Sequence, residues 1–201
     1  MSIPIPAELV KQLRDQTGAG MMECKAALQE ANGNLEDATT ALRKRGLAQA
    51  AKKSGRSTSE GLVGTYIHLG GKIGVLVELN CESDFVARTD DFQTLLKELG
   101  MHIAAANPLY LRREQVPADV LEKERSIYRA QMEGAGKPPQ VIEKIVEGKL
   151  GSFYEQFVLL DQPSIRDPKT TVTQLLQAAI AKLGENISIA RFARFKVGES
   201  A

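Results

Sequence analysis

The chain has 201 residues, of which 43% are hydrophobic and 25% are charged, as in an ordinary globular protein. Its 26 basic and 25 acidic residues leave a net charge of +1. This balance argues against direct nucleic-acid binding, because a phosphate-binding surface needs a clustered excess of Lys and Arg. No window approaches the ~20 apolar residues that span a bilayer, so we expect no membrane association.

The beginning of the sequence, "MSIPIPAELVKQL", has neither a basic segment nor a long apolar one, which predicts that there is no signal peptide. Cys24 and Cys81 lie far apart and form no CxxC motif. Together these features favour a reduced, cytoplasmic setting.

Residues 7–53 are predicted to form three short helices with a thin common core. The first ends near "TGAG" at residues 17–20. The second ends near Gly33, which can adopt the left-handed conformation of a helix end. Asn34 is a suitable N-cap for the third helix, which we expect to end at Gly46. Small helical modules of this kind more often bind partners than catalyse reactions.

A polar stretch, "SGRSTSEG" at residues 54–61, has no periodicity and is predicted to be a linker. The next two apolar segments, "LVGTYIHL" and "KIGVLVELN", flank Gly70-Gly71, which predicts a hairpin with a two-residue turn. Alternate residues of the second strand share one apolar face: Ile73, Val75, Val77 and Leu79.

The remainder of the chain is predicted to be mostly helical. A long helix has an apolar stripe formed by Phe92, Leu95, Leu96, Leu99 and Ile103. A charged helix follows at residues 118–133, then a short helix at 140–150 and another apolar-striped helix that Gly184 ends. The last segment, "ENISIARFARFKV", reads as a strand that pairs with the hairpin. The predicted class is α+β, with a helical head at 1–53, a linker at 54–61 and a core at 62–201.

Few residues suggest catalysis. A nucleophilic pair of Cys81 with His68 requires the fold to join them, and ordinary packing of the thiol explains it better. Cys24, Cys81, His68 and His102 lack the close pairs of a zinc site. The glycines of the hairpin form neither a P-loop nor a GxGxxG motif. We therefore expect no cofactor and no metal ion.

Four acidic residues follow the hairpin: Glu82, Asp84, Asp90 and Asp91. They could hold Mg²⁺ or Ca²⁺, but their spacing is not that of a calcium loop. The favoured interpretation is that Thr89, Asp90 and Asp91 begin the next helix, where acidic residues suit the helix dipole.

The segment "CESDFVAR" (residues 81–88) places an aromatic residue beside a carboxylate at the end of a strand. Pattern alone favours Phe85 folding back into the core while Asp84 starts a helical turn. The alternative is that Phe85 is an exposed anchor on a rigid corner, which fits a pocket in a partner.

Several long blocks resemble the bacterial elongation factor Ts family. They are "TGAGMMECKAALQEANGNLEDA" (17–38), "VELNCESDFVAR" (77–88), "GKPPQVIEKIVEGK" (136–149) and "AKLGENISIARFARF" (181–195). They occur in the family's order over nearly the whole chain. The chain resembles the short form of the family, which has one core module.

The resemblance implies a guanine-nucleotide exchange factor for elongation factor Tu, not an enzyme. It implies a ubiquitin-associated-like three-helix head, followed by an antiparallel three-stranded sheet packed with helices. In the family, Asp and Phe of a Thr-Asp-Phe-Val corner enter between two helices of Tu's G domain, disturb the Mg²⁺ and phosphate sites, and release GDP. Here that corner is Ser83–Val86, including Asp84 and Phe85. Ser83 replaces the usual Thr, and both hydroxyls can cap a turn.

The resemblance also implies that Met21, Met22 and Lys25 lie against the G domain, although the two methionines could instead belong to the core of the head. A homodimer is expected, because a second copy can replace the second module of longer relatives. "ISIARFARFKV", with Phe192 and Phe195 on opposite faces, adds weak support. Two other classes stay open: an adaptor that binds proteins through its head without exchange activity, and a small hydrolase that uses Cys81.

Overall fold

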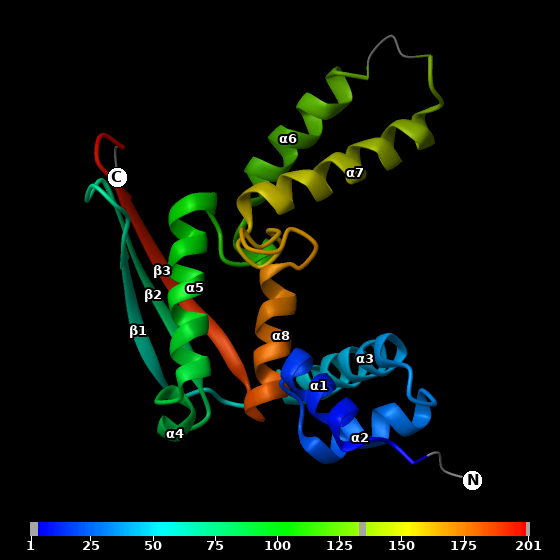
Figure 1. The fold of residues 1–201 in the computed structure, drawn as a ribbon. Helices are drawn as coiled ribbons and strands as arrows, with labels where there is room; N and C mark the ends of the chain where they lie inside the picture. The colour runs from blue at the N-terminus through cyan, green and yellow to red at the C-terminus, as the bar shows by residue number, and fades with distance from the viewer. Residues whose placement is uncertain (1–3, 133–135, 200–201) are drawn as a thin grey trace. The chain divides into compact units, whose positions relative to one another are not determined.

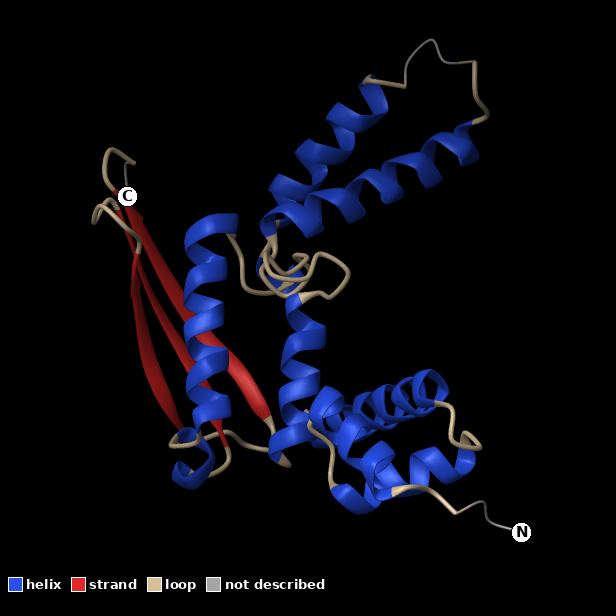
Figure 2. Ribbon diagram, viewed as in Figure 1, coloured by secondary structure: helices blue, strands red, loops and turns tan. Residues whose placement is uncertain are grey.

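The computed structural model describes residues 4–132 and 136–199, which form helices and a small sheet (Figures 1 and 2). In chain order the elements are α1 (Ala7–Thr17), α2 (Met21–Glu30), α3 (Leu35–Lys53), β1 (Glu60–Ile67), β2 (Ile73–Cys81), α4 (Asp84–Ala87), α5 (Asp90–Ala106), the 3-10 helix η1 (Arg113–Gln115), α6 (Ala118–Ala130), α7 (Pro139–Phe157), α8 (Val172–Leu183) and β3 (Ile187–Lys196). The α+β class is confirmed.

The contacts divide the chain into two compact units. The first contains the chain up to Leu62, together with Leu79–Leu95 and Leu175–Ser188. The second contains Val63–Glu78, Leu96–Gln174 and the chain from Ile189 on. Whether residues 1–53, 54–61 and 62–201 behave as separate head, linker and core stays a prediction.

Helices α1, α2 and α3 pack around a small apolar core, and their ends agree with the sequence pattern (Figure 1). Gly18 and Gly33, after α1 and α2, both have positive φ angles. The Oδ1 atom of Asn34 accepts hydrogen bonds from the backbone N–H groups of Glu36 and Asp37, at 2.9 and 3.1 Å. The buried residues of this core are Val10, Leu13, Cys24, Ala27, Leu28, Ala38 and Leu42.

The expectation that the third helix ends at Gly46 is wrong, because α3 continues to Lys53. Gly46 instead lies where α3 meets α8: a Cβ atom at this position would lie 3.1 Å from the Cβ of Ala181. Such a distance is shorter than ordinary carbon contacts, so the missing side chain allows the two helices to approach closely. The glycine therefore serves helix packing, not helix termination.

The sheet has the strand order β1-β2-β3, and its strands are antiparallel. The prediction that the last strand pairs with the hairpin is thus confirmed. The turn is longer than predicted: the N–H of His68 donates to the carbonyl of Ile73 at 2.9 Å, so residues 69–72 form the connection. Gly70 and Gly71 both have the positive φ angles that this turn requires.

Within the second unit, α5 covers one face of the sheet (Figure 2). A Cβ atom on Gly64 of β1 would lie 2.6 Å from Cγ of Leu96, and one on Gly100 would lie 3.0 Å from Cβ of Tyr66. The helix and the strand therefore touch almost backbone to backbone. The predicted stripe of α5 is buried: Phe92, Leu95, Leu96, Leu99 and Ile103.

Helices α6 and α7 form a hairpin in the second unit (Figure 1). The guanidinium of Arg129 on α6 donates to Glu143 on α7 at 2.9 Å. The expected helix at 140–150 is too short, because α7 begins at Pro139 and ends at Phe157. Its apolar stripe continues past two glycines, through buried Leu150 and Phe153. The last residue of the charged helix expected at 118–133 lies outside the described residues.

Candidate functional site

The chain turns sharply after β2, and the turn is the four-residue helix α4, Asp84–Ala87. The N–H of Arg88 donates to the carbonyl of Asp84 at 3.2 Å. The hydroxyl of Thr89 donates to the carbonyl of Val86 at 2.7 Å and accepts from the N–H of Phe92 at 3.3 Å. The corner is therefore continuous with the start of α5, and the prediction that Thr89 caps that helix is confirmed.

Phe85 is 77% exposed, so the interpretation that it folds into the core is wrong. The other part of that interpretation, that Asp84 begins a helical turn, is confirmed. A short helix cannot bury all of its side chains on one small face, and here Ala87 takes the buried position. Phe85 consequently presents a large apolar side chain to solvent at the tip of a structured corner.

The carboxylate of Asp84, beside Phe85, is held by its own helix. The guanidinium of Arg88 donates to Oδ2 of Asp84 at 2.7 Å, one helical turn away. Both side chains are substantially exposed. The corner therefore presents an aromatic ring next to an oriented carboxylate, and the next residue, Val86, is half-buried.

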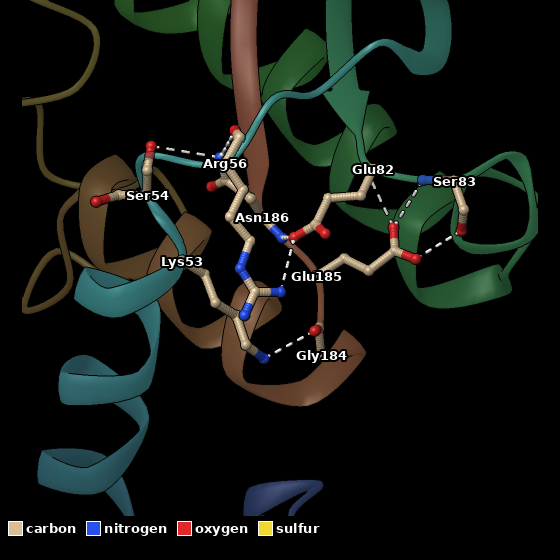
Figure 3. Close-up of polar contacts among 8 residues, drawn as sticks. All are labelled: Lys53, Ser54, Arg56, Glu82, Ser83, Gly184, Glu185 and Asn186. Carbon is tan, nitrogen blue, oxygen red and sulfur yellow. Dashed lines mark hydrogen bonds and ion pairs between the residues drawn. The ribbon is translucent and has the colours of Figure 1, made fainter.

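The expectation that the hydroxyl of Ser83 caps the turn is wrong, because α4 has no side-chain cap. The Oγ of Ser83 instead donates to Oε1 of Glu185 at 2.6 Å. The backbone N–H groups of Ser83 and Glu82 donate to Oε2 of the same carboxylate, at 2.9 and 3.1 Å (Figure 3). Glu185 thus receives the hydrogen bonds of the strand end that leads into the corner.

Sequence patterns did not identify Glu185, although it lies within the quoted "AKLGENISIARFARF" block. It is separated from Ser83 by 102 positions in the chain. The single local signal is its place directly after Gly184, where a helix has ended and a strand has not yet begun. Nothing in that signal indicates which distant segment the side chain contacts.

Cys81 ends β2 and is fully buried. Its thiol donates to the carbonyl of Ser83 at 3.1 Å. Burial, and secondarily the negative charge of Glu185, raises the pKa of the Cys81 thiol.

His68 directly follows β1, and its imidazole pairs with the hydroxyl of Tyr66 at 3.2 Å. A protonated, buried thiol with no imidazole beside it is a poor nucleophile, which counts against a hydrolase.

The four acidic residues near the corner do not converge on one point. Glu82 pairs with Arg56, Asp84 with Arg88, and Asp91 with Lys182. Asp90 is the first residue of α5. Within residues 4–132 and 136–199, no group of three or more His, Cys, Asp or Glu side chains is placed to hold a metal ion.

The head presents a second apolar surface at the start of α2. Met22 is 76% exposed and Met21 is 45% exposed, and neither belongs to the core of the three helices. Lys25 is exposed one turn further along the helix. The alternative that both methionines are core residues is therefore wrong, and a contact role for the three residues stays a prediction.

None of the helices in the described part of the chain combines the length and the apolar character needed to cross a membrane.

Comparison with known proteins gives a consistent result. Residues 8–199 match the family described as Elongation factor TS. The chain is 58% identical to Elongation factor Ts of Solibacter usitatus over 196 residues, covering 98% of this chain and 92% of that protein. It is 60% identical to Elongation factor Ts of Fervidobacterium nodosum over 195 residues, covering 97% and 99% of the two chains. The protein of that name from Thermosipho melanesiensis is 56% identical and is covered over its full length.

Proposed function

The chain belongs to the elongation factor Ts family of translation elongation factors, and on that basis we propose that it is the guanine-nucleotide exchange factor for elongation factor Tu. The observation that carries this proposal is the exposed Phe85 on a braced corner, because a monomer gains nothing by leaving this side chain in water. In this role the chain makes and breaks no covalent bond, and we place it in the cytoplasm with no direct contact to nucleic acid or membrane.

The proposed mechanism is insertion of the corner Ser83–Val86 into the G domain of GDP-bound Tu. The ring of Phe85 enters between two helices of the G domain, and the carboxylate of Asp84 enters beside it. The displaced helices no longer hold the Mg²⁺ ion and the phosphates in place, and GDP leaves. No metal ion or nucleotide bound to the exchange factor itself takes part.

The energy that this mechanism needs is within reach of one aromatic anchor. Weakening GDP binding a hundredfold takes ~2.7 kcal/mol. A well-buried aromatic residue at the centre of an interface commonly contributes about 2 kcal/mol or more. Coupling between two ligands is reciprocal, so GDP must weaken the binding of the exchange factor by the same factor. The complex therefore forms most tightly with nucleotide-free Tu.

The head supplies a second contact in this proposal. Met21 and Met22 place flexible apolar side chains on the surface of α2, with the charge of Lys25 beside them. Contact through the head increases affinity, whereas contact through the corner displaces the nucleotide. Binding and exchange are thus separable functions of different segments.

We further propose that the protein is a homodimer, through the face of the sheet opposite α5. Exposed apolar side chains gather on the strands there: Val63, Ile67, Leu76 and Phe195. Phe195 is 66% exposed and contributes an aromatic ring to this face, whereas Phe192 is half-buried. A two-fold contact uses the same patch twice, so one apolar face is sufficient for both protomers.

Release of labelled GDP from Tu, with and without this chain, tests the proposed function. The exchange factor accelerates release at substoichiometric concentrations, since it dissociates when nucleotide rebinds. An adaptor that binds Tu through its head alone would associate with Tu and leave the release rate unchanged. That result would replace the exchange function with the adaptor function.

A further inference from the structure

The loop between α8 and β3, Gly184–Asn186, contacts the entry of the corner through the side chain of Glu185 and through the backbone N–H of Asn186, which donates to Oε1 of Glu82 at 2.7 Å. Both carboxylate oxygens of Glu185 accept hydrogen bonds from the segment just before α4 (Figure 3). Two of the donors are backbone N–H groups, those of Glu82 and Ser83. They therefore fix the path of the main chain, not only the position of a side chain. Hydrogen bonds to an ionised carboxylate are about twice as strong as neutral ones.

The loop is itself anchored on its other side, to the end of α3 and the residues after it. The side-chain amide of Asn186 donates to the carbonyl of Arg56 at 2.8 Å. The ammonium of Lys53 donates to the carbonyl of Gly184 at 2.7 Å (Figure 3). Asn186 is buried, and its side-chain amide also donates to the carbonyl of Ser54 at 3.4 Å. These hydrogen bonds fix the position of the loop that carries Glu185.

An exposed side chain can displace helices of a partner only if the main chain that carries it keeps its position. Phe85 has few contacts of its own, since most of its side chain is in solvent. Its position therefore depends on the main chain that enters and leaves α4. The exit is fixed by Thr89 at the start of α5, and the entry is fixed by Glu185 and by the thiol of Cys81.

We propose that Glu185 is a positioning residue that fixes the entry of the corner and thereby the direction of Phe85. This inference rests on the proposed exchange function, which it deepens. Glu185 acts only through Phe85 and does not itself enter the partner. Its contribution to exchange must consequently disappear when the aromatic ring is absent.

A double-mutant cycle tests that dependence. Glu185→Ala is expected to slow the release of GDP from Tu that this chain stimulates roughly tenfold, the order that follows from losing charged hydrogen bonds that hold an anchor in place. Glu185→Gln retains an acceptor oxygen for the backbone groups and should recover most of the rate. In the Phe85→Ala background, Glu185→Ala should change the rate less than about twofold. An equal loss in both backgrounds, or no loss from Glu185→Ala alone, would overturn the inference while leaving the exchange function standing.

A second measurement does not depend on exchange. Hydrogen exchange of individual amides, followed by NMR, should show faster exchange at Ala87 and Arg88 in Glu185→Ala, because the turn that protects them is loosened. Amides in the core of the head should keep their protection. Glu143→Ala, which removes a carboxylate paired with Arg129 on the α6–α7 hairpin, is the matched control and should leave the corner amides unchanged. Unchanged exchange at Ala87 and Arg88 in Glu185→Ala would contradict the proposal, whatever the activity of the wild type.

Discussion

Phe85 and Phe92 lie seven positions apart on consecutive helices, α4 and α5, yet Phe92 is fully buried whereas Phe85 is 77% exposed. The two rings have the same chemistry and opposite surroundings. One contributes its apolar area to the stability of this chain, and the other keeps that area in water. Within one short segment, Phe92 therefore stabilises the fold, and Phe85 is left available for a partner.

The exposed methionines of the head provide the first prediction. Replacing both Met21 and Met22 by Ala should lower the affinity for Tu about thirtyfold, which corresponds to a loss of ~1 kcal/mol at each of the two positions. The free energy of unfolding should change by less than about 0.5 kcal/mol, because neither residue is in the core. Calorimetric titration and urea unfolding measure the two quantities. Leu28→Ala, in the buried face of the same helix, should show the opposite behaviour.

The comparison of Gly46 with Gly148 provides the second prediction. Gly46→Leu should lower the free energy of unfolding by about 1–3 kcal/mol, because the added side chain meets Ala181 on α8. Gly148 lies within α7, and a side chain at this position would extend into open space, so Gly148→Leu should be neutral or stabilising. Equal effects of the two substitutions in chemical denaturation would contradict the role assigned to Gly46.

Much of the fold followed from sequence periodicity. The stripe of α5, the N-cap at Asn34 and the pairing of the last strand all depend on local spacing, and all are confirmed. The wrong expectation about the end of α3 has a different cause. Gly46 did not end a helix because α8, distant in the sequence, packs against it. Helix-stop rules describe local preference, and a tertiary contact can override it.

The site was less predictable for a related reason. Pattern alone placed Phe85 in the core, since large aromatic residues are usually inside. Only the resemblance to a family indicated the opposite. Glu185 gave no signal, because its role depends on a hydrogen bond to Ser83 that crosses half of the chain. A residue that acts through a contact with a distant segment cannot be recognised from the spacing of its neighbours in the sequence.

The buried imidazole of His102 provides a prediction about pH. His102 lies against Gln162, at 2.9 Å, and burial lowers the pKa of its imidazole below the ordinary value of 6.5. The unfolded chain therefore binds a proton more readily than the folded chain. Stability should be complete above about pH 6.5 and should fall as the pH decreases through the lowered folded-state pKa, by at most ~1.4 kcal/mol per pH unit.

Urea unfolding at several values between pH 7.5 and pH 5 measures this effect. His102→Gln removes the titrating group and should flatten the dependence in that interval. A His102→Gln variant that retains the slope of the wild type would show that other groups cause the acid sensitivity.

The exposed sheet face provides the fourth prediction. Light scattering should give a mass near twice the 21.9 kDa of one chain at tens of micromolar. Phe195→Asp, which places a charge on each half of the two-fold contact, should give the mass of one chain. Leu69→Asp, in the hairpin turn and off the sheet face, should leave the mass unchanged. A wild-type mass equal to one chain, with exchange activity intact, would end the dimer proposal.

The most direct test of the central claim is the release of labelled GDP from Tu in the presence of Phe85→Ala, measured beside the thermal unfolding of the same variant. Removing an exposed ring leaves the fold intact, so Tm should stay close to that of the wild type while stimulated release falls about tenfold or more. Phe92→Ala is the matched control and should unfold at much lower temperature, because a buried ring contributes about 3–5 kcal/mol. The account predicts that Phe85→Ala unfolds close to the Tm of the wild type and stimulates GDP release at least about tenfold more slowly. A Phe85→Ala variant that releases GDP at the wild-type rate would contradict it.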